Sequence, residues 1–197
     1  FVFHQGNESD GIWCVYSGIL MMSNVDTNGN ERVVRFATQG ETIGARSYFA
    51  GEDHTLSAKA LTQTTTCYLH REVVNGLIST HPAVAMQFLH SVSVKLRMAH
   101  EKSHQFGTMN VREKVSYLIL QLTKQLGQRG INESSSFYLP LTNKDMANFI
   151  GVAPESFSRT IRKLNDDGVL NLDKRIVNIH CLSTLRREAN INPHTVL

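Results

Sequence analysis

The sequence has no apolar run long enough to cross a membrane, and its few cysteines follow no ligand spacing. Because no stretch of about 18 apolar residues occurs, we expect no membrane span. The start at Phe1 shows no basic-then-apolar signal peptide. Cys14, Cys67 and Cys181 lie far apart without a C-x-x-C or Cys/His pattern, so neither a disulfide framework nor a zinc site is expected. These features predict a reducing, cytoplasmic location.

Motifs of enzyme active sites are missing as well. No nucleophile stands with a base, and no phosphate-binding loop or pair of carboxylates appears in context, so we do not expect an enzyme. His100 and His104 have the i,i+4 spacing of a metal pair, but this spacing is more often found on a solvated helix face. The chain begins with Phe1 rather than Met, so we expect that a natural upstream segment is missing.

Charge is distributed unevenly over the 197 residues. Residues 1–80 hold 5 Lys/Arg against 8 Asp/Glu, whereas residues 81–197 hold 15 against 9. A basic rear half predicts that a polyanionic partner would bind there, although an imbalance of this size also arises by chance.

The first seventy residues indicate β structure. Seven of the 13 glycines fall in this stretch and separate short β-prone runs. The Asn28-Gly29 pair between two of these runs predicts a tight type I′ hairpin turn. Many short strands with regular turn signals favour a sandwich, barrel or roll. The expected strands cover 12–16, 18–25, 31–37 and 64–70.

After Pro82 the hydrophobic period becomes helical. Apolar or small residues alternate spacings of four and three, which predicts a long helix over about 82–105 with a heptad seam. We expect this seam to pair two chains; the alternative is a single helix packed on its own β domain. A hinge is expected over 107–110, a second amphipathic helix over about 115–126, and a polar loop over 127–136. The seam residues are Ala85, Leu89, Val92, Leu96, Ala99, Ser103 and Phe106.

The stretch 141–164 has the pattern of a helix-turn-helix. Thr142 followed by Asp145 resembles a capping box and begins a short helix to Phe149. Gly151 can adopt the positive φ that a tight turn needs, and Pro154 suits the first position of a new helix. Helix, short glycine turn and helix together predict a DNA-binding motif.

The second helix of this motif has two faces. Phe157, Ile161 and Leu164 follow an i, i+4, i+7 spacing and should point inward, which leaves a polar face outside. A Glu can accept a hydrogen bond from cytosine N4, and an Arg can donate two to guanine O6 and N7. We therefore expect this helix to read bases in the major groove; the alternative is a solvated face with a stabilising i,i+4 pair of Glu155 and Arg159. The expected base-reading residues are Glu155, Ser158 and Arg159.

A predicted hairpin with a basic tip follows this helix. Asp167-Gly168 should end the helix, and two β-prone runs enclose Asp173-Lys174-Arg175, as in the wing of a winged helix. Basic tip residues suit phosphate contacts, which position a protein without specifying sequence. The expected phosphate-contacting residues are Thr142, Ser156, Arg162, Lys174 and Arg175.

These features together resemble the CRP/FNR family of bacterial transcription regulators over essentially the whole chain. The stretch 151–159 is the most specific part: in the FNR branch, a Glu followed by Ser-Arg three and four residues later reads a TTGAT-type half-site. Gln128-Arg129-Gly130, Phe137 and Leu141-Thr142 also resemble that branch. The resemblance implies an α+β fold with a cyclic-nucleotide-binding-like jelly roll (1–81), a dimerisation helix and hinge (82–108) and a winged helix-turn-helix (109–197).

The effector pocket departs from the family's cyclic-AMP pattern. Cyclic-nucleotide binders carry Gly-Glu and, about nine residues on, Arg-Ser/Thr, where the Glu holds the ribose and the Arg the cyclic phosphate. The matching positions here are Gly44-Ala45 and His54-Thr55, so cyclic AMP is not expected to be a ligand and the effector is unknown.

The stretch 58–67, which ends at Cys67, resembles the place where FNR has the internal cysteine of its [4Fe–4S] cluster. The other three cluster cysteines of FNR precede the roll, and one thiolate cannot hold a cluster. An Fe–S cluster is therefore expected only if upstream cysteines exist, and Cys67 otherwise suits a small buried hydrophobe.

Two hypotheses follow. The first is a homodimeric regulator that binds double-stranded DNA, and also RNA polymerase if it is an activator. The second is a ligand- or redox-sensing module, with haem, an Fe–S cluster or a small molecule in its roll, for which DNA binding is secondary. An absorption spectrum separates them, because a cofactor would colour the protein.

Overall fold

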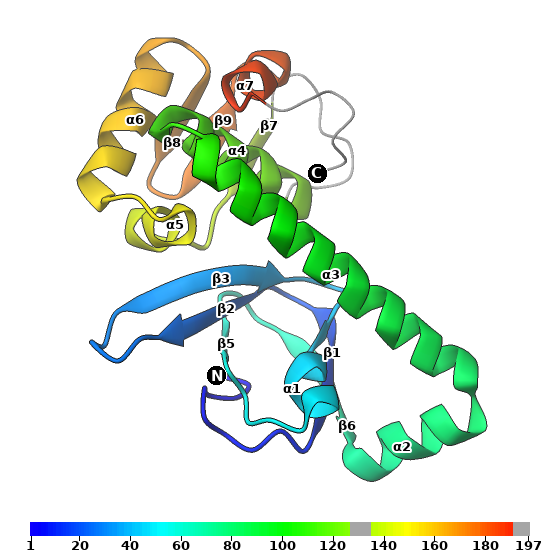
Figure 1. The fold of residues 1–197 in the computed structure, drawn as a ribbon. Helices are drawn as coiled ribbons and strands as arrows, with labels where there is room; N and C mark the ends of the chain where they lie inside the picture. Colours follow the sequence, from blue (N-terminus) through cyan, green and yellow to red (C-terminus); the bar gives the residue numbers. More distant parts are fainter. Residues whose placement is uncertain (127–134, 191–197) are drawn as a thin grey trace. The chain divides into compact units, whose positions relative to one another are not determined.

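The computed structural model describes residues 1–126 and 135–190, and the chain divides into two compact units, Phe1–His104 and Gln105–Leu197 (Figure 1). The fold is α+β, as predicted, with a β-rich N-terminal unit, long helices and a C-terminal helix-turn-helix. Within the described residues, no helix has both the length and the apolar character that a membrane crossing requires.

The N-terminal unit is a roll of two antiparallel sheets, each with three strands, ordered β4-β1-β6 and β3-β2-β5. All four predicted β runs are strands: β1 (Gly11–Ser17), β2 (Leu20–Val25), β3 (Glu31–Ala37) and β6 (Thr65–His70). Side chains from both sheets share one core cluster, which includes Val15, Leu20 and Ile43. The structure adds two short strands that the sequence did not indicate, β4 (Thr42–Ile43) and β5 (Ser57–Ala60).

The β2–β3 hairpin forms where expected, but its type I′ turn was wrong. A type I′ turn needs positive φ at both central residues, and of Asn28 and Gly29 only Gly29 has it (81°). The loop is longer because the Asp26 carboxylate accepts hydrogen bonds from the backbone N–H groups of Asn28 (2.8 Å) and Asn30 (2.9 Å). The hydrogen bonds from Asn30 are the main cause of an Asp26 pKa below its ordinary value.

Two helices that the sequence reading missed cover the outer face of the β4-β1-β6 sheet. They are α1 (Ala45–Ala50) and α2 (Arg71–Thr80). A second core cluster joins Ile12 of β1 to Tyr48 of α1 and Val74 of α2. The Tyr48 hydroxyl donates to the Asn75 side-chain oxygen (2.8 Å), which ties the two helices together.

Helix α3 (Pro82–Thr108) confirms the predicted long helix. One side packs on the roll: the ring of Phe88 lies 5.3 Å from that of Phe49, and the Lys95 ammonium donates to the backbone oxygen of Thr42 (3.0 Å). Burial lowers the pKa of Lys95. The other side exposes Leu89 (59%) and Leu96 (55%), so α3 has one face on the roll and an apolar face without a partner in the described chain.

The junction after α3 differs from the predicted hinge over 107–110. Gly107 and Thr108 are helical, and the break falls at Met109 and Asn110. A helical glycine costs only about 1 kcal/mol relative to alanine, so the helix runs through it. Asn110 begins α4 (Val111–Leu126) with a reciprocal cap: its side chain accepts from the Glu113 N–H (3.0 Å), and Glu113 accepts from the Asn110 N–H (2.7 Å).

The C-terminal unit packs α4, α5 (Asn143–Ile150), α6 (Pro154–Asp166) and α7 (Leu182–Glu188) with an antiparallel sheet, ordered β7-β9-β8. Its strands are β7 (Ser135–Tyr138), β8 (Leu170–Asp173) and β9 (Ile176–Ile179). The loop predicted over 127–136 lies outside the described residues up to 134. The predicted loop was wrong at Ser135 and Ser136, because these residues belong to β7 and pair with β9. Backbone hydrogen bonds between strands form whatever the polarity of the side chains.

Arg112 joins three helices of this unit. Its guanidinium contacts Asp167, directly after α6, at 2.7 Å and Glu188 on α7 at 2.6 Å, and its side chain is only 30% exposed. The hydrogen bond to Glu188 is the main cause of an Arg112 pKa above its ordinary value.

We expect Arg112→Ala to lower the free energy of unfolding of the C-terminal unit by about 1–3 kcal/mol, because charged hydrogen bonds at a half-buried site are lost. Urea denaturation followed by circular dichroism measures the change. The control is Arg97→Ala, which removes an exposed i,i+4 pair with Glu101 and should cost less than about 1 kcal/mol. Equal losses in both variants would contradict this role for Arg112.

Candidate DNA-binding interface

The turn between α5 and α6 is built as the sequence predicts. The Thr142 hydroxyl accepts from the Asp145 N–H (3.1 Å), and the Asp145 carboxylate accepts from the Thr142 N–H (2.9 Å), which completes the capping box. Gly151 has φ 66° and ends α5, and Val152 donates to the carbonyl of Ala147 (3.0 Å). Pro154 is the first residue of α6. Local hydrogen bonds therefore fix where each helix starts and stops.

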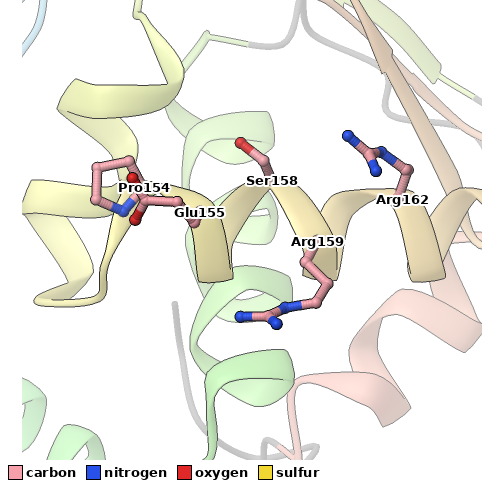
Figure 2. A pocket seen from close by; sticks show the side chains of 5 residues that line it. All are labelled: Pro154, Glu155, Ser158, Arg159 and Arg162. Carbon is pink, nitrogen blue, oxygen red and sulfur yellow. The ribbon is translucent and has the colours of Figure 1, made fainter.

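Burial fixes which face of α6 points outward. Phe157, Ile161 and Leu164 are buried, at 0%, 7% and 0% exposure. On the other side, an open depression of about 470 Å³ lies along the helix, lined by Pro154, Glu155, Ser158, Arg159 and Arg162. Figure 2 shows these five side chains distributed along α6, from Pro154 at its N-terminal end to Arg162.

The i,i+4 ion pair of Glu155 and Arg159, which belonged to the alternative reading of this face, is not formed in the described structure. The Arg159 guanidinium instead donates to the Ser156 hydroxyl at 3.3 Å, a long hydrogen bond between exposed groups. Both charged side chains are exposed. Because neither is neutralised by the other, each keeps its hydrogen-bonding capacity for an external group.

The β8–β9 hairpin confirms the predicted wing, and its tip carries a feature that the sequence analysis missed. Lys174 and Arg175 have φ values of 43° and 71° and form the two-residue connection between Asp173 and Ile176. Positive φ at both positions is the backbone of a type I′ turn, which usually holds Asn or Gly. The conformation costs about 1–2 kcal/mol per ordinary residue. The Arg175 carbonyl accepts from the Leu139 N–H (2.7 Å), which holds the tip in place.

The predicted phosphate-contacting residues differ in exposure and in whether their side chains already have a partner. Arg162, Lys174 and Arg175 are exposed and make no ion pair with a described acidic residue. Ser156 is half-buried and accepts from Arg159. The Thr142 hydroxyl already donates to Asp145 (2.7 Å), so its side chain serves the helix cap. Other exposed basic side chains of this unit that have no described acidic partner are those of Lys144, Lys163, Arg186 and Arg187. The FNR-like Gln128-Arg129-Gly130 lies outside the described residues.

The four predicted effector positions lie together where β4 meets α1 and in the loop before β5. Gly44 has φ 83°, and a Cβ at this position would lie 3.2 Å from Trp13 and 3.3 Å from His54. Ala45 is buried at the start of α1. Thr55 is exposed, and its hydroxyl accepts from Arg46 (2.7 Å). The sequence analysis missed Arg46, which also pairs with Glu52 (3.2 Å).

His54 is enclosed by aromatic rings. Its side chain stacks on Phe3 at 3.9 Å, and Trp13 lies 5.5 Å away. His54 is 2% exposed, and its Nε2 atom has no hydrogen-bond partner among the described residues. Burial lowers the pKa of His54, which disfavours the charged form of the ring. A buried, stacked imidazole therefore stands at the position where a phosphate site is expected to have a permanent cation.

Comparison with known proteins identifies both units. Residues 1–81 match the family model "Cyclic nucleotide-binding domain", and residues 113–188 match "Crp-like helix-turn-helix domain". The chain belongs to the CRP/FNR family. It is therefore a transcription regulator with a helix-turn-helix DNA-binding domain and a sensing domain of the cyclic nucleotide-binding type.

Individual relatives agree with this family. The "Anaerobic regulatory protein" of Haemophilus influenzae is 23% identical over 93% of this chain and 71% of its own length. "Electron transport regulator A" of Shewanella oneidensis is 24% identical over 96% and 76%. The structure of FixK2 from Bradyrhizobium japonicum is 19% identical and shares the fold, with a TM-score of 0.83 over 99% of this chain and 93% of that one.

The residues at the predicted effector positions of this CRP/FNR protein lack the polar anchors that a cyclic nucleotide needs. The methyl group of Ala45 cannot accept a hydrogen bond from a ribose hydroxyl, and His54 is buried and stacked. An Fe–S cluster needs four thiolates, and the described residues contain no group of three or more His, Cys, Asp or Glu side chains that could hold a metal ion.

Proposed function

We propose that this CRP/FNR protein acts as a homodimer that reads a palindromic TTGAT-type DNA site through α6, under the control of an effector other than cyclic AMP. The observation that carries the proposal is the exposed face of α6, where two arginines, a glutamate and a serine stand opposite three buried apolar residues. This function is the first of the two hypotheses drawn from the sequence.

Base reading follows from the chemistry of that face. Arg159 offers a planar fork of donors that matches guanine O6 and N7, and Glu155 can accept from cytosine N4. The two residues are one helical turn apart near the N-terminus of α6, the end that enters the groove in helix-turn-helix proteins. Ser158 stands between them and could contact a neighbouring base edge. We therefore assign readout of a G·C pair to Glu155 and Arg159.

The proposed phosphate contacts come from basic side chains of this unit that have no acidic partner among the described residues. Lys174 and Arg175 project from a wing tip whose backbone is held by the Leu139 hydrogen bond, and Arg162 lies further along α6. Ser156 lies in the first turn of α6, where backbone N–H groups and the helix dipole favour an anion. Thr142 is the weakest of the proposed phosphate contacts, because its hydroxyl proton is already donated to Asp145.

Dimerisation follows from the exposed face of α3. Leu89, Leu96 and Ala99 are exposed, whereas Val92 is half-buried beside the roll. Phe106, the last of the predicted seam residues, is half-buried and packs edge-on against Tyr117 at 5.5 Å. Met86 (64% exposed) lies three residues before Leu89 and extends the stripe. A second copy of α3 fits this stripe, because the apolar stripes of two identical helices have the same period and can pair in a coiled coil.

We expect Arg159→Ala to weaken binding to a TTGAT-type palindrome by about 1–3 kcal/mol and to remove discrimination at one base pair. Lys174→Ala should weaken binding to all sequences alike and reduce the salt slope by about one unit. Titration of both variants against the palindrome and its single-base variants, at several salt concentrations, separates the two effects. Equal loss by Arg159→Ala on specific and scrambled DNA would show that α6 does not read bases.

We expect the double substitution Leu89→Glu and Leu96→Glu to dissociate the dimer, because it brings like charges together in an apolar seam. Sedimentation velocity measures the oligomeric state. Met98→Glu is the matched control, since Met98 is 47% exposed on the same helix but points away from the stripe. An unchanged dimer in the double variant would exclude α3 as the interface.

We expect no cyclic-AMP binding at micromolar concentrations, because Ala45 and His54 cannot supply the two polar anchors. Isothermal titration calorimetry is the measurement, with a cyclic-AMP-binding member of the family as the positive control. A micromolar dissociation constant for this protein would refute the assigned effector position.

A further inference from the structure

Two cysteines that are 53 positions apart in the sequence face each other in the roll. In the antiparallel pairing of β1 with β6, Cys14 is the direct partner of Cys67. Side chains of directly opposite residues lie on the same face of a sheet. The register therefore brings two thiols together that the sequence analysis treated as separate.

The spacing of such a pair suits a disulfide with slight strain. Directly opposite residues of an antiparallel pair have Cα atoms about 4.5–5.5 Å apart, and a disulfide spans about 4.4–6.8 Å. Their Cβ atoms lie about 4.5–5.5 Å apart, slightly beyond the usual 3.5–4.5 Å or so of a disulfide. Closing the bond would thus need a small approach of the strands, and strained disulfides are the readily reduced, regulatory ones.

The two thiols have different surroundings. Cys67 is exposed, whereas Cys14 is half-buried, and both are free in the structure. Burial raises the pKa of the Cys14 thiol, and the neighbouring Cys67 adds to the rise. An exposed thiol is the one that an oxidant reaches first, and the half-buried thiol beside it is placed to resolve the product.

We propose that Cys14 and Cys67 form a dithiol site in the roll that hydrogen peroxide closes to a reversible disulfide. The Cys67 thiolate attacks one peroxide oxygen, the O–O bond breaks, and the leaving hydroxide takes up a proton to become water. The Cys14 sulfur then attacks the Cys67 sulfenic acid, and the hydroxyl group leaves with the thiol proton as a second water. The two thiols lose two electrons and two protons in total, and the peroxide is reduced to two water molecules.

This inference is independent of DNA binding, because it concerns only the β1–β6 pair. It differs from a cluster site, since it needs two thiols and no metal. In a reducing compartment, disulfides are usually transient and serve redox sensing or catalysis. The expected state of the site at rest is therefore the dithiol.

The test uses the full chain with Cys181→Ser, so that only the proposed pair remains. Hydrogen peroxide should lower the free thiols per chain from two to zero and remove two hydrogen atoms from the intact mass. Dithiothreitol should restore both thiols, and peptide mapping should join the β1 and β6 peptides. If Cys181→Ser fails to fold, peptide mapping of the unmodified protein gives the same answer.

The matched control moves one thiol out of reach. Cys67→Ser combined with Thr65→Cys keeps two thiols on the same strands, and Thr65 is exposed on the same face. The diagonal distance to Cys14 is then about 7–8 Å, so an intramolecular disulfide should not form. Oxygen addition at Cys67 without loss of hydrogen in the paired protein, a link only between chains, or equal closure in the control would each overturn the proposal.

Discussion

The burial of three side chains on α6 determines what the C-terminal unit can present to DNA. Helix α6 packs against α4, α5 and β8, and its buried residues are Phe157, Ile161 and Leu164. Each fully buried side chain of this kind contributes about 1.5–3 kcal/mol, more than any surface ion pair along the helix could. Rotating α6 would expose these residues, so Glu155, Ser158 and Arg159 are held outward by the core and not by contacts of their own. The capping box of α5 and the turn at Gly151 set the position of the helix along its axis.

The N-terminal roll keeps the family fold but changes the chemistry at the effector position. A stack of His54 on Phe3, beside Trp13, lies at the position that we assign to the phosphate-binding arginine of cyclic-nucleotide binders. Aromatic packing stabilises the roll there without a bound anion. Next to His54 in the sequence, the exposed Thr55 hydroxyl accepts a hydrogen bond from Arg46. We therefore propose that other groups of the roll read the signal, and the Cys14–Cys67 pair is one candidate.

The sequence predicted the elements whose signals are local. The helix-turn-helix was predictable because Thr142, Gly151 and Pro154 each fix one helix end, and the wing because two β-prone runs enclose a short polar tip. Helix α2 was missed because Gly76 and several β-branched residues weaken the helical signal of its sequence. Val74 and Ile78 nevertheless show the i,i+4 spacing of its buried face. No sequence signal predicted the positive φ angles of Lys174 and Arg175, because the pairing of β8 with β9 imposes this conformation on residues that disfavour it.

Features that depend on tertiary pairing could not be predicted. The register of β1 with β6, and therefore the meeting of Cys14 and Cys67, results from how the two sheets close over their core. The burial of His54 depends likewise on Phe3 and Trp13, which come from distant parts of the chain. Among the α6 residues, the sequence identified the exposed face but not the partner of Arg159, because an i,i+4 ion pair and a hydrogen bond to Ser156 are equally compatible with the spacing.

The central claim is that α6 of each subunit lies in the major groove of a palindromic site. Dimethyl sulfate protection of a TTGAT-type palindrome by the unmodified protein tests it most directly, because methylation occurs at guanine N7 in that groove. The account predicts one protected guanine in each half-site, with the two half-sites about one helical turn apart. Guanines that stay fully reactive at protein concentrations that retard the DNA would contradict it.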